Sequence, residues 1–208
     1  PRRPESRFVD DGSFMPLAEV RISPLDRAFL FGDAVYEVIP VHAGQAFLLD
    51  PHLDRLERSL RELGIRNPCR RAEWIDIING LIEQNGGGNL AVYLQVSRGA
   101  DIKRDHAFPP ESVRPTVFGM VSTMAEPHPD QLGLRAITCA DQRWSRCDIK
   151  STALLANLLA RQAARDAGAG EAILLRDGYL TEGSASSVII VERGVLIRGG
   201  RPLHGAAV

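Results

Sequence analysis

The sequence contains little lysine and no excess of charge of either sign. Among its 208 residues there are 25 basic ones, of which only Lys103 and Lys150 are lysines. The 25 basic and 26 acidic residues are spread along the chain and give a net charge of -1. This pattern lacks the basic patch that binds nucleic acid or an anionic membrane, so we expect a small-molecule partner, no nucleic acid and no membrane.

Cysteine and long apolar segments are also scarce. Cys69, Cys139 and Cys147 form no Cys-x-x-Cys pair and leave one thiol over. That number argues against a disulfide framework or a zinc site and is typical of a reducing compartment. No apolar run approaches the ~20 residues of a membrane span, and the stretch PRRPESRFVDDGS lacks the apolar centre of a secretory signal. We therefore expect a cytoplasmic protein without a metal site.

The first part of the chain has the pattern of a hairpin followed by two helices and two strands. Residues 35–49 predict a hairpin around the turn residues 42–45. A helix capped by Asp50 should carry a stripe of leucines and end at Gly64, and a second helix should cover 71–84. The leucine stripe consists of Leu53, Leu56, Leu60 and Leu63. Strands are predicted at 90–98 and 116–123, and the long polar loop ADIKRDHAFPPESVRP between them is a functional candidate because connectors are usually shorter.

The second part follows the proline-containing stretch MAEPHPDQLG, which has no periodicity. A strand is predicted at 134–140, a helix at 151–167 and a strand pair joined by the turn Asp177-Gly178. The chain is therefore predicted to be α+β, with two domains. Residues 1–123 form the smaller N-terminal α+β domain, 124–133 the linker and 134–208 the larger C-terminal domain.

Lys150 is the first candidate for chemistry. It lies in RCDIKSTALLANLLARQAA (146–164), between an apparent strand end and a helix rich in alanine and leucine. A surface lysine is the ordinary interpretation, but this chain uses arginine for nearly all its positive charge, so each lysine needs its own reason. An uncharged primary amine attacks an aldehyde, and arginine cannot form a Schiff base.

Glu182 is the second candidate. In LTEGSASSVII it stands before a glycine- and serine-rich turn, and the backbone N–H groups of such a turn can surround an anion. Taken alone, this glutamate is better interpreted as an exposed turn residue. Its interpretation depends on the other motifs of the chain.

Four motifs occur in one order along nearly the whole chain. They are FLFGDAVYEV (29–38), HLDRL (52–56), CDIKS (147–151) and TEGSAS (181–186). Together they resemble the fold-type IV pyridoxal-phosphate enzymes, the family of branched-chain and D-amino acid aminotransferases. The similarity is greatest to the D-amino acid aminotransferases, since it continues through HAFPPESVRPTVFG and RWSRCDIKS. The resemblance implies the two-domain α+β fold of that family and pyridoxal 5'-phosphate as cofactor.

The resemblance also implies roles for individual residues in the transfer of an amino group between an amino acid, such as D-alanine, and a 2-oxo acid. Lys150 would hold the cofactor as an internal aldimine and then act as general base and acid. Glu182 would pair with the pyridinium nitrogen, and Arg55 would bind the phosphate. From helical periodicity alone, Arg55 lies opposite the leucine stripe and faces solvent, but a helix between two domains can bury both faces, so we keep the phosphate-binding role. The turn Gly183, Ser184, Ala185 and Ser186 would surround the phosphate.

Arg104 and His106 resemble the Arg-x-His pair that binds the substrate α-carboxylate in the D-amino acid subfamily, where Tyr36 assists. There the loop comes from the neighbouring subunit, so the resemblance implies a homodimer with a shared active site. The alternatives from the residues alone are a solvated arginine, a surface histidine and a packed strand tyrosine.

Two departures from the family leave alternatives open. Ser187 stands where the family's turn commonly has asparagine, and neither of the later turns that complete the phosphate site is found before the chain ends in LIRGGRPLHGAAV. We therefore expect an incomplete second domain, a shortened version of a longer chain, and weak cofactor binding. The alternatives are a branched-chain aminotransferase, an aminodeoxychorismate lyase of the same fold, and a truncated non-catalytic paralogue.

Overall fold

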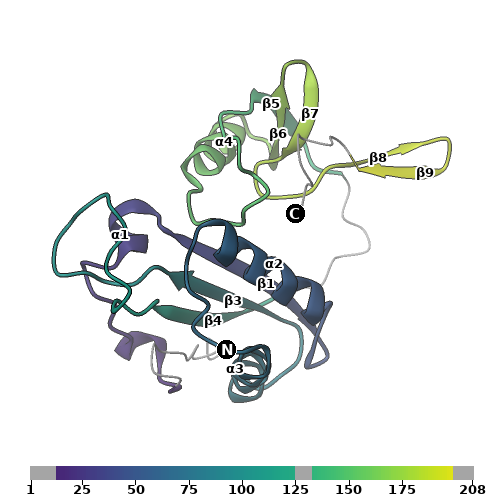
Figure 1. Cartoon of the computed structure of the whole chain (residues 1–208). Coiled ribbons are helices and arrows are strands. Elements are labelled where there is room, and N and C mark those ends of the chain that lie inside the picture. The colour runs from purple at the N-terminus through teal and green to yellow at the C-terminus, as the bar shows by residue number, and fades with distance from the viewer. Residues whose placement is uncertain (1–12, 125–132, 199–208) are drawn as a thin grey trace. The chain divides into compact units, whose positions relative to one another are not determined.

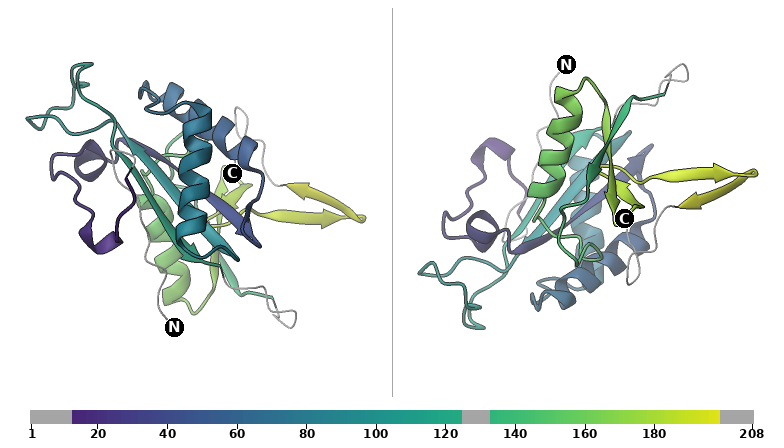
Figure 2. Two further views of the ribbon diagram at one scale, coloured as in Figure 1. Left: turned by 90° about the horizontal axis from the view of Figure 1, so that it is seen from below. Right: turned by 90° about the horizontal axis from the view of Figure 1, so that it is seen from above.

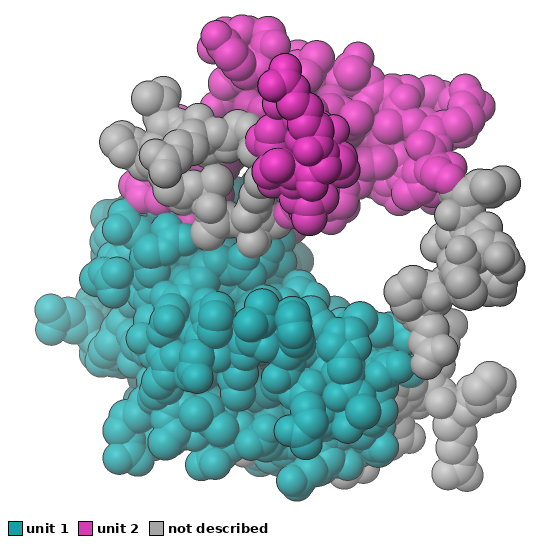
Figure 3. All heavy atoms as spheres, turned by 90° about the vertical axis from the view of Figure 1, so that its right-hand side faces the viewer, with its two compact units in different colours: residues 1–127, 149–153 teal, residues 128–148, 154–208 magenta. Residues whose placement is uncertain are grey.

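A computed structural model of the chain describes residues 13–124 and 133–198. The chain divides into two compact units, one of residues 1–127 with 149–153 and one of residues 128–148 with 154–208 (Figure 3). Most of the predicted linker, 124–133, and the last ten residues lie outside the described part. The predicted domain boundaries stay a prediction.

Unit 1 is built on an antiparallel four-stranded sheet with the order β2-β1-β3-β4 (Figure 1). Its strands are β1 (Ala34–His42), β2 (Gln45–Ala46), β3 (Leu90–Ser97) and β4 (Val117–Thr123). A short η1 (Leu17–Glu19) and α1 (Arg27–Phe31) precede the sheet. The hairpin and both strands predicted around the long polar loop are confirmed.

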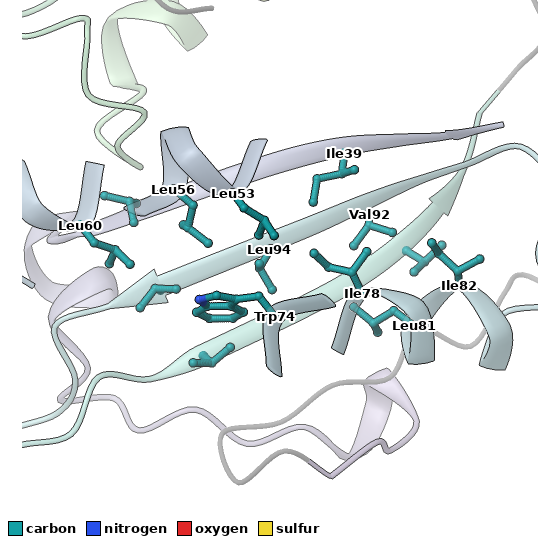
Figure 4. Packing of buried hydrophobic residues seen from close by; sticks show 14 of the residues in the cluster. Ile39, Leu53, Leu56, Leu60, Trp74, Ile78, Leu81, Ile82, Val92 and Leu94 are labelled. Atoms are coloured by element: carbon teal, nitrogen blue, oxygen red, sulfur yellow. The ribbon is translucent and has the colours of Figure 1, made fainter. Parts of the chain in front are cut away.

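Two helices, α2 (Leu49–Glu62) and α3 (Arg71–Gln84), cover one face of this sheet, and their course can be followed in Figure 2. Figure 4 shows side chains of both helices meeting those of β1 and β3. The fully buried members of this core include Leu53, Leu56, Trp74, Ile78, Leu81, Ile39, Val92 and Leu94. The leucine stripe therefore packs as predicted, because residues three and four apart share one face of a helix.

The start of α2 differs from the prediction. The N-cap residue is Leu48, whose φ of 51° is left-handed, and no side chain caps the helix. Asp50 lies in the first turn, where its Oδ1 instead accepts a hydrogen bond from Arg71 Nη2 at 2.9 Å. The Asp50 carboxylate, which the local pattern predicts as the cap of α2, therefore binds Arg71 of α3 instead.

The segment after Ile149 also departs from the prediction, because α4 begins at Leu155 and not at Ser151. Ser151 forms an antiparallel bridge with Val35, and Thr152 N donates to Ala34 O at 3.0 Å. Residues 149–153 therefore extend the edge of β1 within unit 1. Ser151 and Thr152 satisfy their backbone groups with β1 and do not enter the helix.

Unit 2 contains a three-stranded sheet of β5 (Ala136–Ala140), β6 (Glu171–Arg176) and β7 (Tyr179–Gly183). The helix α4 (Leu155–Asp166) connects the parallel pair β5 and β6. The predicted turn joins β6 to β7, and its residues Asp177 and Gly178 have φ values of 51° and 81°, as a two-residue hairpin requires. A separate hairpin pairs β8 (Ile189–Glu192) with β9 (Val195–Arg198).

Across residues 13–124 and 133–198, none of the helices has the length and apolar character that crossing a membrane requires.

Candidate functional site

Lys150 is held at the edge of the unit 1 sheet by its own backbone. Its carbonyl oxygen accepts a hydrogen bond from Tyr36 N at 2.9 Å, and its N–H donates to Ser59 Oγ at 3.3 Å. The neighbouring Ile149 is buried in the core, and in extended backbone successive side chains point to opposite faces. Lys150 is therefore directed away from that core by its position in the strand register.

The amine of Lys150 lies against Tyr36. Its Nζ donates to Tyr36 Oη at 3.5 Å and is 4.5 Å from the centre of the tyrosine ring. Tyr36 stacks on Tyr93 with ring centres 5.6 Å apart, and Tyr93 Oη donates to Gln95 Oε1 at 2.7 Å. Burial, with a smaller effect of the Glu37 carboxylate, raises the pKa of Tyr36, and burial raises the pKa of Tyr93 to about 12. Both hydroxyls therefore stay protonated at neutral pH. That of Tyr93 donates to Gln95, and that of Tyr36 contacts the amine.

Arg55 projects from α2 toward β1, where it meets a buried carboxylate. Its Nε and Nη2 donate to the two oxygens of Glu37 at 2.6 and 2.7 Å, and His52 Nδ1 is 2.9 Å from Glu37 Oε2. The Arg55 side chain is only 14% exposed. Periodicity alone indicates solvent, whereas the guanidinium lies against the sheet because Glu37 on β1 binds it.

Glu37 is itself fully buried. Burial alone raises the pKa of its carboxyl, but the hydrogen bonds from Arg55 and His52 outweigh burial and leave the pKa below its ordinary value. The carboxylate is therefore ionised and fixes the edge of the guanidinium that Nε and Nη2 form. Within the described residues, Nη1 of Arg55 donates to no acceptor, which leaves this nitrogen for an anionic ligand.

Glu37 and His52 were not among the residues predicted from sequence. A signal for Glu37 existed, because it alternates with Val35, Ile39 and Val41, which all point into the core. A glutamate in that register must either be paired or lose its charge. The motif HLDRL contains its two partners.

In unit 2, Glu182 lies near the end of β7, paired across the sheet with Leu174. Its Oε1 accepts a hydrogen bond from Val188 N at 3.1 Å. Burial lowers the pKa of Arg143, but its hydrogen bond to Asp141 and, to a smaller extent, the negative charge of Glu182 raise that pKa above its ordinary value. Glu182 thus presents a carboxylate on a strand beside the glycine- and serine-rich turn.

That turn is closed by its own backbone and by Glu171. Gly183 N donates to Ser186 O at 2.9 Å, and a Cβ at Gly183 would lie 2.6 Å from the same oxygen, so this position requires glycine. The hydroxyls of Ser184 and Ser186 both donate to the Glu171 carboxylate. Burial alone raises the pKa of Glu171, but the serine hydrogen bonds lower it to about 2. The hydroxyls and the N–H groups of Gly183 and Ser184 are occupied, so among the described residues the backbone N–H groups of 185–187 are the donors that the turn offers to an anion.

Arg104 and His106 lie together on the long loop of unit 1, and both contact the ring of Phe31. The Arg104 guanidinium is 4.7 Å from the centre of Phe31, and the His106 ring centre is 5.3 Å from it. Within the described part of unit 1, neither side chain contacts Lys150 or Arg55 through a hydrogen bond, an ion pair or a ring contact. The structure therefore brings Arg104 and His106 together, and it does not place them in contact with Lys150 of the same chain.

The residue types in the two units fit a phosphorylated aldehyde cofactor. Unit 1 offers a primary amine on Lys150 and an unused guanidinium nitrogen on Arg55, and unit 2 offers the carboxylate of Glu182 and the backbone donors of a turn. An amine that attacks an aldehyde, donors for a phosphate and a carboxylate for a protonated ring nitrogen are the groups that pyridoxal phosphate needs.

Known proteins resemble this chain over most of its length. The family model described as amino-transferase class IV matches residues 34–200. A D-alanine aminotransferase of Bacillus licheniformis is 39% identical over 191 residues, which are 91% of this chain and 67% of the relative. A D-alanine aminotransferase of Staphylococcus epidermidis is 36% identical over 187 residues, 89% of this chain. The chain thus spans 66% of the length of this curated relative.

A solved structure shows the same fold. The branched-chain aminotransferase of the archaeon Thermoproteus uzoniensis, crystallised with norvaline, superposes with a TM-score of 0.79 at 24% identity, over 93% of this chain and 67% of that one. The predicted α+β fold of type IV is confirmed by this likeness.

Proposed function

Because the chain belongs to the class IV aminotransferase family, we propose that it transfers an amino group from an amino acid to a 2-oxo acid with pyridoxal 5'-phosphate as cofactor. The donor is a D-amino acid such as D-alanine. The observation that carries the proposal is Lys150, whose Nζ is held at the Tyr36 hydroxyl by a backbone that is paired with β1. A lysine fixed in this way is suited to covalent catalysis.

When bound, pyridoxal phosphate supplies an aldehyde that takes up the amino group and a ring that accepts electrons from the substrate Cα. Lys150 Nζ would hold the cofactor through its aldehyde and, when free, would serve as the base and acid that carries the substrate proton. Tyr36 Oη orients this nitrogen through the hydrogen bond already described. Rigid placement matters because proton transfer requires the base within hydrogen-bond reach of its proton.

The remaining roles concern binding. Arg55 receives the phosphate through Nη1, while Glu37 holds the rest of its guanidinium in place. Glu182 would pair with the ring nitrogen, and the backbone donors of the turn Gly183 to Ser186, those of Ala185 and Ser186, would add to the phosphate site. A bidentate carboxylate behind the arginine keeps its free edge in one orientation, which lowers the entropy lost on binding.

The preference for D-amino acids is supported by the curated relatives, both D-alanine aminotransferases at 36% and 39% identity. It is also supported by the adjacent cation and imidazole of Arg104 and His106, which can bind a carboxylate together with Tyr36. A branched-chain aminotransferase is the second candidate, because the solved enzyme of that name shares the fold.

The separation of the loop pair from the lysine of the same chain supports a homodimer in which the loop serves the partner's site. A reducing cytoplasmic location is supported by three cysteines that are unpaired in the structure.

An amino-transfer assay tests the proposal. The full-length protein is incubated with pyridoxal phosphate, a 2-oxo acid, and D-alanine, L-alanine or L-leucine in turn, and pyruvate or the new amino acid is measured. Transfer from D-alanine should exceed transfer from L-alanine. Preference for L-leucine would move the protein to the branched-chain class, and no transfer from any donor would refute the proposal. Lys103→Ala, which removes the other lysine, is the matched control for Lys150→Ala.

A further inference from the structure

Arg27 is a buried arginine whose contacts are not explained by the residues discussed so far. It begins α1, and its side chain is 6% exposed. Its backbone N–H donates to Gly99 O at 3.0 Å, and Asp26 before it accepts a hydrogen bond from Ser97 Oγ at 2.7 Å. The start of α1 is thereby fixed to the end of β3, where the long loop begins.

The guanidinium of Arg27 connects a carboxylate to the loop. Its Nε donates to Asp33 Oδ2 at 2.7 Å. Nη1 donates to the carbonyl oxygens of Asp105 at 2.7 Å and Ala107 at 3.2 Å, and Nη2 is 3.5 Å from His106 O. Three consecutive carbonyls of the loop therefore surround one cation, directly after Arg104 in the sequence.

Asp33 is shared between two arginines. Arg98 also donates to it, through Nε at 2.8 Å and Nη2 at 3.0 Å. Burial alone raises the pKa of Asp33, but the hydrogen bonds from Arg98 and Arg27 outweigh it and keep the pKa below its ordinary value. One carboxylate facing two cations leaves a net positive charge. The carbonyls of Leu63 and Gly64 accept hydrogen bonds from Arg98, and the loop carbonyls accept those of Arg27.

A buried guanidinium without acceptors is costly, so Arg27 and the loop hold each other in place. The same helix also touches the predicted substrate residues. Phe31, one turn after Arg27, has the guanidinium of Arg27 4.8 Å and that of Arg104 4.7 Å from its ring centre, and it lies against His106. One short helix, α1, therefore contacts both the backbone of residues 105–107, through Arg27, and the side chains of Arg104 and His106, through Phe31.

We propose that Arg27 is a positioning residue, which fixes the backbone of residues 105–107 so that Arg104 and His106 are presented together for the substrate carboxylate. This inference rests on the proposed function of that pair. Lysine cannot replace the arginine fully, since a single ammonium cannot reach both Asp33 and three carbonyls in the way a planar fork does. The positive charge of residue 27 is not itself a substrate ligand in this arrangement.

Hydrogen exchange tests whether Arg27 fixes the backbone of residues 105–107, and it does not require turnover. Amide exchange at residues 104–108, with tryptic cleavage after Lys103 and Arg104, is measured on the full-length protein with pyridoxal phosphate. Arg27→Met should accelerate exchange and cleavage about tenfold or more, and Arg27→Lys by an intermediate factor. Arg71→Ala, which removes a surface arginine paired with Asp50, should change neither. The lysine variant serves if the methionine variant is too unstable to purify.

A double-mutant cycle then tests the connection to substrate. Arg27→Met should raise the KM for D-alanine about tenfold, equivalent to one charge-assisted hydrogen bond, and by less than about twofold when Arg104 is already alanine. A merely structural role would change KM by equal factors in both backgrounds.

Failure of the inference and failure of the proposed function give different results. Unchanged exchange in the folded Arg27 variants, or equal KM factors with and without Arg104, would overturn the inference. If the wild-type protein transfers no amino group, the proposed function fails, and exchange still shows whether Arg27 holds the loop.

Discussion

Removal of the Glu37 carboxylate should destabilise unit 1 strongly, since it leaves Arg55 without its partner. Glu37 is fully buried, and it is joined by Arg55 at 2.6 and 2.7 Å and by His52 at 2.9 Å. Breaking a buried ion pair from one side costs ~3–5 kcal/mol, because the remaining charge is desolvated and unpaired. Glu37→Ala should therefore lower the free energy of unfolding by about that amount, and Glu37→Gln by less.

Trp74 provides a probe of this unit, because it is fully buried in the core and its Nε1 donates to Asn67 Oδ1 at 3.1 Å. Urea unfolding is followed by its fluorescence in a Trp144→Phe background, which removes the tryptophan of unit 2. Glu57→Ala is the matched control, since Glu57 meets Arg71 at the surface of the same unit and such pairs contribute ~0–1 kcal/mol.

A double replacement separates stability from function. Glu37→Leu combined with Arg55→Leu should restore most of the stability, because apolar residues of similar volume can replace a buried pair at little cost. The same variant should bind pyridoxal phosphate poorly, because it has no guanidinium for the phosphate. If Glu37→Ala unfolds within ~0.5 kcal/mol of the wild type, the interpretation of this buried pair is wrong.

The pH dependence of the stability of Glu37→Ala gives an independent check. The folded-state pKa of Glu37 lies below its unfolded value near 4.5. Its contribution to stability is therefore fully present above pH 4.5 and is lost as the pH falls through the lower folded-state pKa. The wild-type protein should lose stability over this acid range, whereas Glu37→Ala should lose less.

Three further changes have defined outcomes. Arg104→Ala should raise the KM for D-alanine about ten- to a hundredfold in steady-state kinetics and leave that of an amine without a carboxylate unchanged; equal effects on both would remove Arg104 from the substrate site. Burial raises the pKa of Asp141, but hydrogen bonds, that of Arg143 foremost, lower it to about 2. Its stabilisation is present above the unfolded pKa of 3.8 and lost as the pH falls through about 2, so Asp141→Asn should lower stability at neutral pH and flatten acid unfolding measured by circular dichroism; an unchanged acid profile would contradict this. Gly183→Ala would place a Cβ 2.5 Å from Ser186 Oγ and should weaken cofactor binding in a titration, while unchanged affinity would exclude the turn from the phosphate site.

Much of the fold could be predicted from the sequence, because local patterns agreed with the tertiary structure. The helix α3 begins at Arg71 and ends at Gln84, as its apolar periodicity predicts. The turn at Asp177 and Gly178 follows from the left-handed backbone that a short hairpin needs. In these segments no distant partner competes with the local preference.

The errors have a common physical cause, which is competition from distant partners. Asp50 has the sequence of a helix cap but pairs with Arg71, 21 residues later. Thr152 hydrogen-bonds to β1 instead of starting α4, so Lys150 lies on a sheet edge and not at a helix start. Arg55 faces a carboxylate on β1, although helical periodicity alone predicts solvent. Such contacts join residues far apart in sequence, and periodicity carries no information about them.

In the candidate site, too, some residues could be predicted from the sequence and others could not. The motifs identify Lys150 and Glu182 by their order along the chain, and Tyr36 is found beside the lysine amine. Two further residues support these groups from behind. Glu37 lies within FLFGDAVYEV but carries no role there that the sequence alone could assign, and Glu171 lies outside all four motifs. Support of this kind is visible only when hydrogen-bond partners are known.

Identification of the lysine that bonds the cofactor tests the central claim most directly. The full-length protein is loaded with pyridoxal phosphate and reduced with borohydride, and its peptides are examined by mass spectrometry. The sequence offers only two lysines, and Lys103 is an exposed residue paired with Asp105 at 3.2 Å, which makes it an internal control. The proposed function predicts a phosphopyridoxyl group on the peptide that contains Lys150. The same group on Lys103, or on neither lysine, would contradict it.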